Sequence, residues 1–249
     1  MPQSGLVASR VVVAPNFAIL PPEGVPESVL PGWDKTAARI LAAPPMGANF
    51  AYYLLDVQAG GGVTQTLEED VEAFFYLMSG EATLTLNGVA HGIKPGGYAY
   101  LSPGSEYTLA AKSLGRLQWV KKVYEPLDRG ARPADVVGNE KDVKGEPFLE
   151  IAELLLKKLL PEDLAYDIAM NIFTFPPGYS LPMIETHVME HGLYMLEGQG
   201  LYYLGDAWRE VKADDFIWMG PYCPQSFYAT SSSAARYIYY KNVNRDVEL

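Results

Sequence analysis

Two of the three histidines in this chain lie four residues apart in one short segment that begins at Gly178. The segment contains Glu185, His187 and His191. Side chains two residues apart on a strand point to the same face, so Glu185 and His187 can reach one ion together. After a bend, His191 can supply a third ligand from the neighbouring strand. This mixed nitrogen and oxygen set suits Mn, Fe, Zn or Ni, and the absence of thiolates argues against a soft-metal site.

The same residues also have an ordinary structural interpretation. A Glu-x-His-x-x-x-His string arises by chance, and on a helix the two histidines would simply be i and i+4 neighbours. The string alone therefore leaves both interpretations open. The secondary structure expected around it is needed to choose between them.

Most of the chain consists of short β-branched, aromatic and aliphatic runs separated by Gly, Pro, Asn and Asp. Examples are the segments 51–57, 73–78, 82–86, 98–101 and 236–240. This spacing predicts an all-β sandwich or barrel. The one strong helical candidate is 148–160, which is apolar and ends before Pro161, and it predicts a short helix between two halves of the chain.

An internal repeat defines the architecture better than any single strand. The nine residues 72–80 match 190–198 in strand pattern and in the final glycine, at an offset of 118 residues. The same offset relates Gly60 to Gly178 and Lys94 to Lys212, without a gap from about 60 to 103. We expect two copies of one β domain, 1–125 and 126–249, with a linker at 125–146 that is rich in Pro, Gly and charge.

The repeat also separates scaffold residues from candidate ligands. At the offset of 118, the counterparts of Glu185, His187 and His191 are Leu67, Glu69 and Ala73. A histidine pair with a purely structural role would have less reason to differ between the copies in this way. We therefore predict a metal site in the second copy and none in the first.

The pattern resembles the cupin family, whose first motif is Gly-x5-His-x-His-x3,4-Glu-x6-Gly and whose second is Gly-x5-Pro-x-Gly-x2-His-x3-Asn. Here Glu185 stands for the first histidine after one extra residue, His187 keeps the second, and His191 stands where glutamate is usual. The second motif survives in part as Gly97-x5-Pro103, and its histidine position in the second copy is Gln225. The resemblance implies two tandem cupin (double-stranded β-helix, jelly-roll) barrels, a bicupin. A glutamine oxygen is a weak neutral donor, which favours Mn over Zn.

A narrower resemblance is to the (S)-ureidoglycine aminohydrolases, bicupin enzymes of allantoin degradation in purine catabolism. It is carried by the permuted ligand order, the stretch 184–192, the phrase Gly198-Gln-Gly200 and the ending 241–249. The resemblance covers nearly the whole chain and is densest from Asn171 onward. It implies Mn²⁺ in the second barrel, with Fe, Zn or Ni less favoured, and release of ammonia from (S)-ureidoglycine to give (S)-ureidoglycolate. Carried over by position, it names Lys241 as a substrate contact and the metal ligands Glu185, His187, His191 and Gln225.

These groups suit that chemistry. A divalent cation can hold the carboxylate and amine of ureidoglycine while water replaces the amine. Glu185 is our candidate for moving protons between water and departing ammonia, and Lys241 for offsetting the substrate carboxylate. From the residues alone, Lys241 is as readily a solvated lysine near the terminus.

Other chemically interesting residues carry less of the prediction. Aromatic side chains on barrel strands are mostly packing residues, and of the four tyrosines concerned Tyr237 is preferred as a pocket residue. Cys223 is interpreted as a buried inert thiol, Glu190 with its counterpart Glu72 as structural, and His91 as a surface residue near an Asn87-Gly88 hairpin. The tyrosines are Tyr194, Tyr202, Tyr237 and Tyr239.

Composition excludes several classes of partner. The net charge of −11 repels phosphate backbones, and the Lys and Arg residues form no basic stripe, so nucleic acid and anionic membranes are not expected partners. A single cysteine permits no internal disulfide, and no long apolar run or secretory leader is visible. We expect a cytoplasmic protein with a small-molecule substrate and, by analogy with other bicupins, a homo-oligomer.

Two alternatives stay open at this stage. The first is another metal-dependent cupin enzyme, a dioxygenase or isomerase, for which iron dependence and oxygen consumption would speak. The second is a non-catalytic small-molecule-binding or storage bicupin, which would not require the metal ligands.

Overall fold

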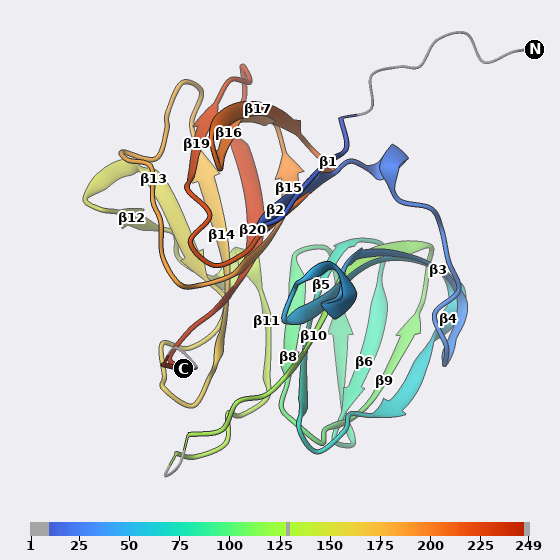
Figure 1. The fold of residues 1–249 in the computed structure, drawn as a ribbon. Helices are drawn as coiled ribbons and strands as arrows, with labels where there is room; N and C mark the ends of the chain where they lie inside the picture. The colour runs from blue at the N-terminus through green and yellow to red at the C-terminus, as the bar shows by residue number, and fades with distance from the viewer. Residues whose placement is uncertain (1–9, 128–129, 247–249) are drawn as a thin grey trace, which may run out of the picture.

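The computed structural model describes residues 10–127 and 130–246 and is built almost wholly from β-strands (Figure 1). The helical elements of these ranges are the 3-10 turns η1 (Pro22–Gly24), η2 (Pro44–Met46) and η3 (Glu140–Asp142). The all-β prediction is confirmed. None of these described helices is long and apolar enough to cross a membrane.

The first barrel is one sheet with the strand order β11-β8-β5-β10-β4-β9-β6-β7, to which β3 adds by pairing with β4. Its strand β4 is long enough to pair with β10 along its first half and with β9 along its second half. The strands are β3 (Trp33–Ala42), β4 (Phe50–Thr66), β5 (Val71–Ser79), β6 (Ala82–Leu86), β7 (Val89–Ile93), β8 (Gly97–Leu101), β9 (Glu106–Ala111), β10 (Gly115–Val123) and β11 (Val136–Asn139).

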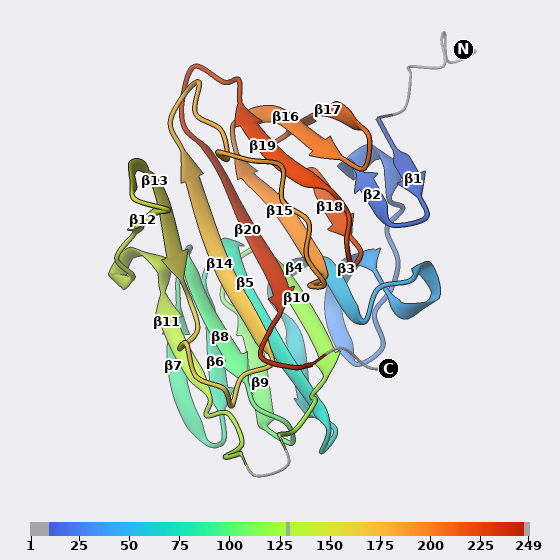
Figure 2. The ribbon, with the colours of Figure 1, turned by 60° about the vertical axis from the view of Figure 1, so that its left-hand side comes forward.

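The second barrel is made of two sheets. One has the order β1-β2-β18-β15-β20-β14-β13-β12 and the other the order β17-β16-β19. Figure 2 shows β14, β20 and β15 side by side in the larger sheet. The strands are β1 (Val12–Ala14), β2 (Phe17–Leu20), β12 (Glu146–Phe148), β13 (Ile151–Lys158), β14 (Ile168–Phe175), β15 (His191–Glu197), β16 (Gln199–Leu204), β17 (Ala207–Lys212), β18 (Phe216–Met219), β19 (Gln225–Ala229) and β20 (Ala235–Asn242).

The predicted repeat is visible in the strand pairings. Ala73 pairs with Leu101 in the first barrel, and His191 pairs with Met219 in the second, each 118 residues further along. The offset extends beyond the range found in the sequence, since β3 pairs with β4 in the same register as β13 with β14. Both halves of the chain are copies of one architecture.

The last strand of each copy departs from this offset by two residues. Ala73 lies opposite Lys121 on β10, whereas its counterpart His191 lies opposite Lys241 on β20. The loop before β20 is two residues longer than the loop before β10, which absorbs the difference. The structural counterpart of Lys241 is therefore Lys121.

The two copies exchange their first strands. Strand β2 pairs with β18 of the second barrel, and β11, which lies 118 residues after β2, pairs with β8 of the first barrel (Figure 1). The division of the chain into domains 1–125 and 126–249 remains a prediction. In the structure, β2 of the first half belongs to the sheet of the second barrel, and β11 of the second half belongs to the sheet of the first. Because each barrel holds a strand from the other half, the barrels are joined by backbone hydrogen bonds as well as by packing.

The predicted helix at 148–160 is wrong. Phe148 ends β12, and 151–158 forms β13 between β12 and β14. Leu and Lys favour helix in isolation, but this segment is the counterpart of β3 and supplies the same edge of the repeated sheet. The segment 125–146, expected to be a linker, contributes β11 and η3.

Three apolar cores hold the molecule together. Each barrel has its own interior, and a third core lies between the two large sheets. Burial of each large side chain in this third core contributes about 1.5–3 kcal/mol. Its aromatic members from the two barrels include Phe50, Tyr52, Phe74, Tyr100, Tyr194, Phe216, Trp218 and Tyr240.

Candidate metal centre

A cavity of about 560 Å³ opens into the second barrel and collects the predicted site residues. Strands β14, β15, β16, β19 and β20 and the segment 181–187 supply its walls. Apolar side chains such as Phe173 and Leu193 form much of the surface around the polar groups. The predicted residues on the wall are Glu185, His187, His191, Gln225, Tyr237 and Lys241.

The two histidines face each other at the polar end of this cavity. Their Nε2 atoms are 3.1 Å apart, and His191 is buried at the start of β15. Burial lowers the pKa of His187, and the nearby Lys241 ammonium lowers it further. Burial also lowers the pKa of His191 well below its usual value, with His187 and Lys241 adding to the effect. Both imidazoles are thus held neutral, which is the form that binds metal ions.

Gln225 is held beside the histidines by a cross-strand pair with Glu185. The Glu185 N–H donates to the Gln225 carbonyl at 2.8 Å, and the Gln225 N–H donates back at 2.9 Å. The Gln225 side-chain amide lies 3.0 Å from His187 Nε2. Rotation of this amide by half a turn would present its oxygen instead of its nitrogen.

One carboxylate and one ammonium complete the charges of the site. Burial raises the pKa of Glu185, an effect that Lys241 opposes, and burial lowers the pKa of Lys241, an effect that Glu185 opposes. Lys241 is placed here by the register of β20, which sets it opposite His191. The cavity therefore combines a cationic group with a carboxylate and two neutral imidazoles.

Three of the four tyrosines considered from the sequence line the cavity: Tyr202, Tyr237 and Tyr239. Burial raises the pKa of each, so their hydroxyls stay protonated. Tyr194 instead lies in the core between the barrels and donates to Asp214 at 2.8 Å.

The remaining candidates lie outside the cavity wall. Cys223 is buried, and burial raises the pKa of its thiol, which keeps it protonated. Cys223 precedes β19, so it does not share a strand with Gln225. Buried Glu190 accepts hydrogen bonds from Trp218 Nε1 at 2.7 Å and from the Asn49 N–H at 3.0 Å, which agrees with a structural role. His91 is half-buried in the β6–β7 hairpin.

Several residues on the wall of the cavity were not predicted from the sequence. Phe148 was assigned to a helix, although it lines the cavity at the end of β12. Behind the wall, the Asn171 amide, which was not considered, donates to the Tyr239 hydroxyl at 3.1 Å. Extending the repeat to 148–160 would have aligned β13 with β3. No local pattern marks Phe173, Leu181 or Met219 as cavity residues, because their alternation is that of any barrel strand.

The donor set fits a divalent cation. Two neutral imidazoles and an amide could hold such an ion, because His191 Nε2 and the Gln225 side-chain amide both lie at hydrogen-bonding separations from His187 Nε2. These separations are 3.1 Å and 3.0 Å. Within the described ranges no three His, Cys, Asp or Glu side chains are close enough to share an ion, so Glu185 is the candidate whose side chain would have to turn.

Comparison with known proteins agrees with this architecture. Residues 171–240 match the cupin domain family, and residues 47–124 match the EutQ-like cupin domain. The fold and these matches define the class of the protein as a two-barrel cupin.

Full-length relatives narrow the class. The chain is 38% identical to (S)-ureidoglycine aminohydrolase of Escherichia coli (strain K12), over 98% of this chain and 95% of that protein. It is 34% identical to the enzyme of the same name from Arabidopsis thaliana, over 96% and 79% of the two chains. The chain belongs to the (S)-ureidoglycine aminohydrolase family.

Solved structures show the same relationship in three dimensions. The E. coli protein Ylba matches with a TM-score of 0.88 at 38% identity, over 98% of each chain. A putative glyoxylate-induced protein from Pseudomonas aeruginosa matches with a TM-score of 0.89 at 33% identity, over 98% and 94% of the chains. Oxalate decarboxylase shares the fold at 11% identity and a TM-score of 0.70.

Proposed function

We propose that this chain catalyses the hydrolytic release of ammonia from (S)-ureidoglycine, giving (S)-ureidoglycolate. The observation that carries the proposal is the relationship along nearly the whole chain to proteins named for this activity. The polar groups of the cavity support it, because they offer a cation for a carboxylate and a donor set for a metal ion.

The metal proposed for this site is Mn²⁺, with Fe, Zn or Ni as less favoured choices. A neutral amide oxygen and a carboxylate are hard donors, which favour Mn²⁺ over Zn²⁺. When bound, the ion supplies positive charge that orients the substrate and polarises the water that attacks it. Its proposed ligands are Glu185, His187, His191 and Gln225.

Two side chains of the cavity are proposed to hold the substrate. The Lys241 ammonium pairs with the substrate carboxylate, and the negative charge of Glu185 partly opposes the lowering of the Lys241 pKa by burial. The protonated Tyr237 hydroxyl can donate a second hydrogen bond to the substrate. Tyr237 lies on β20, the strand that also carries Lys241, and it lines the cavity together with Tyr239. The apolar walls around them exclude bulk water and strengthen these polar contacts.

The reaction replaces one bond to the central carbon with another. The oxygen of water bonds to that carbon, its bond to the amine nitrogen breaks, and a proton passes from water to the departing amine. Glu185 is proposed as the group that accepts and returns this proton. No redox step is required, and water is the only co-reactant.

The direct test is an ammonia-release assay on freshly generated ureidoglycine, with the protein stripped by a chelator and then reloaded with Mn²⁺. We expect release that depends on the metal, and a product of S configuration from the same sample. Oxygen consumption without ammonia release would instead support the alternative of a cupin dioxygenase. A homo-oligomeric state and a cytoplasmic location remain predictions, tested by light scattering and by cell fractionation.

A further inference from the structure

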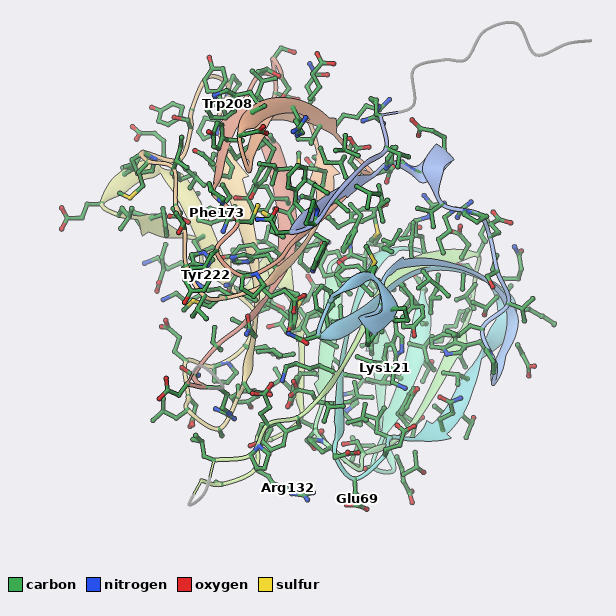
Figure 3. All side chains as sticks on the ribbon, viewed as in Figure 1. Glu69, Lys121, Arg132, Phe173, Trp208 and Tyr222 are labelled. Carbon is green, nitrogen blue, oxygen red and sulfur yellow. The ribbon has the colours of Figure 1, made fainter. Side chains whose placement is uncertain are left out.

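A second cavity, of about 440 Å³, opens in the first barrel at the place that corresponds to the candidate metal centre. Figure 3 labels one side chain from each cavity, Lys121 in the first barrel and Phe173 in the second. The repeat relates Gln65, Leu67 and Glu68 on the wall of this cavity to residues on the wall of the other. The whole wall is Leu30, Pro31, Trp33, Tyr53, Gln65, Thr66, Leu67, Glu68, Trp119 and Lys121.

The first barrel has lost the metal donors and kept the cation. The counterparts of the four proposed ligands are Leu67, Glu69, Ala73 and Tyr107. Glu69 is turned away, since its side chain is 88% exposed and lies 3.7 Å from Arg132. Lys121, by contrast, occupies the position of Lys241, opposite Ala73 as Lys241 is opposite His191.

The polar groups of this cavity are mainly hydrogen-bond donors. The Lys121 ammonium has one acidic neighbour, Glu68, at 3.9 Å, and that side chain is 65% exposed at the rim. Gln65 uses its oxygen to accept from the Tyr107 hydroxyl at 3.1 Å, which leaves its NH2 group available. The half-buried Tyr53 hydroxyl has no hydrogen-bond partner among the described residues, and burial raises its pKa. A wall of unused donors suits a ligand rich in acceptor oxygens.

Aromatic rings close the inner end of the cavity. Trp119 is buried, lies edge-on to Trp33 at 5.8 Å between ring centroids, and lies 5.4 Å from Tyr107. These rings lie in the interior of the barrel, and Trp33 and Trp119 form aromatic surfaces on the cavity wall. Such surfaces favour a small ligand with a planar group.

We propose that the first barrel contains a second, metal-free site that binds a small planar carboxylate through Lys121, Tyr53 and Gln65. The geometry supports it independently of the reaction in the second barrel. Because the net charge of −11 disfavours anions over the chain as a whole, the local positive charge of Lys121 is what would hold a carboxylate in this cavity.

Tryptophan fluorescence can report this site selectively. Two of the four tryptophans, Trp33 and Trp119, line the proposed site, whereas no tryptophan is among the described residues that line the metal-centre cavity. The probe is hydantoate, which has one carboxylate and a flat ureido group, titrated into the full-length metal-loaded protein at constant ionic strength. We expect a saturable fluorescence change in the wild type.

Variants of the equivalent lysines Lys121 and Lys241 show which of the two cavities gives rise to the fluorescence change. Lys121→Met should weaken hydantoate binding roughly tenfold or more, equivalent to about 1.4 kcal/mol, while Lys121→Arg should largely retain it. Lys241→Met should leave the fluorescence titration in place, and Lys121→Met should leave ammonia release in place. Tyr53→Phe removes one donor and should weaken binding a few-fold. Circular dichroism establishes that each variant is folded.

Two outcomes would overturn the proposal. One is the absence of a saturable change in the wild type. The other is a titration that is the same in Lys121→Met as in the wild type, which would assign the signal to another part of the molecule.

Discussion

The two barrels follow the same plan but use the segment after their first long strand differently. In the first barrel, 62–66 continues β4 and pairs residue by residue with β9. In the second barrel the corresponding segment makes only isolated bridges to β19, at Ser180 with Tyr228 and at Glu185 with Gln225. Pro182 replaces Thr64 and Pro224 replaces Glu106, and a proline cannot donate to a β ladder. Glu185 and His187 therefore reach the cavity wall from a segment outside the regular strands, where Glu185 is held by its bridge to Gln225.

The comparison shows how one scaffold can surround its two cavities with different side chains. Both barrels keep a lysine at the same place on their last strand. They differ in the side chains around it, which include Trp119 in the first cavity and the pair His187 and His191 in the second.

The largest effect is expected from the histidines that distinguish the second barrel. His187→Ala or His191→Ala should remove bound metal and lower kcat/KM by at least roughly 100-fold, because each takes away a nitrogen donor. Metal content by mass spectrometry and ammonia release provide the two measurements. His91→Ala, in the first barrel, is the matched control and should change neither. Full metal content in both variants would refute the proposed ligand set.

A smaller effect is expected from the lysine that the two barrels share. Lys241→Met should lower kcat/KM for ureidoglycine by roughly 10- to 100-fold, since a charged hydrogen bond to the substrate carboxylate is lost. Metal content should be unchanged. Lys121→Met is the control, because it removes the equivalent lysine without touching the metal-centre cavity. Equal losses in both variants would mean that the lysines act through the fold.

The buried glutamates Glu190 and Glu72 are also equivalent, but they have different partners. Glu190 accepts hydrogen bonds from Trp218 Nε1 and from the Asn49 N–H. In Glu190→Gln the side-chain NH2 group would face one of these N–H donors, and that hydrogen bond would be lost. We expect unfolding free energy to fall by about 1–2 kcal/mol. Urea denaturation checks this, and an unchanged midpoint would show that the two hydrogen bonds contribute little.

For Glu72→Gln we expect a gain in stability instead of a loss. Burial and the neighbouring Asp167 carboxylate raise the pKa of Glu72 well above its ordinary 4.5, although Lys122 donates to Asp167 at 2.6 Å. A carboxyl group with a raised pKa stabilises the fold fully below its unfolded pKa, and this contribution is lost as the pH rises through the folded value. Glu72→Gln stays neutral, so its stability relative to the wild type should increase as the pH rises above about 4.5, by about 1.4 kcal/mol for each pH unit up to the folded pKa of Glu72.

Thermal melts of Glu72→Gln and the wild type at several pH values measure this difference. The Gln oxygen can still accept from Tyr100, which keeps the remaining contacts comparable. A difference in melting temperature that is independent of pH would show that Glu72 titrates as an ordinary exposed glutamate does.

Local patterns predicted more of the second barrel than of the connections between barrels. Glu185, His187 and His191 were selected by residue type and spacing, but the strand expected to carry Glu185 and His187 is wrong, because both precede β15 and Glu185 makes only an isolated bridge to Gln225. Their restriction to one copy follows from the repeat. The helix at 148–160 was wrong because its Leu and Lys residues favour helix locally, while the sheet edge beside β14 favours a strand. The two-residue shift that aligns Lys241 with Lys121 depends on a loop length whose effect appears only in the pairing of β20.

By itself, the sequence determined that the chain is a duplicated β protein, that donor residues are confined to one copy, and that this donor order is typical of one enzyme family. Those features are local or periodic, so they can be recognised without knowing what lies opposite each strand. Only the tertiary structure decided that the copies exchange strands β2 and β11, that Lys241 lies beside His191, and that a second cavity remains in front of Lys121. These depend on pairing between residues far apart in the chain, which strand register and loop length set together.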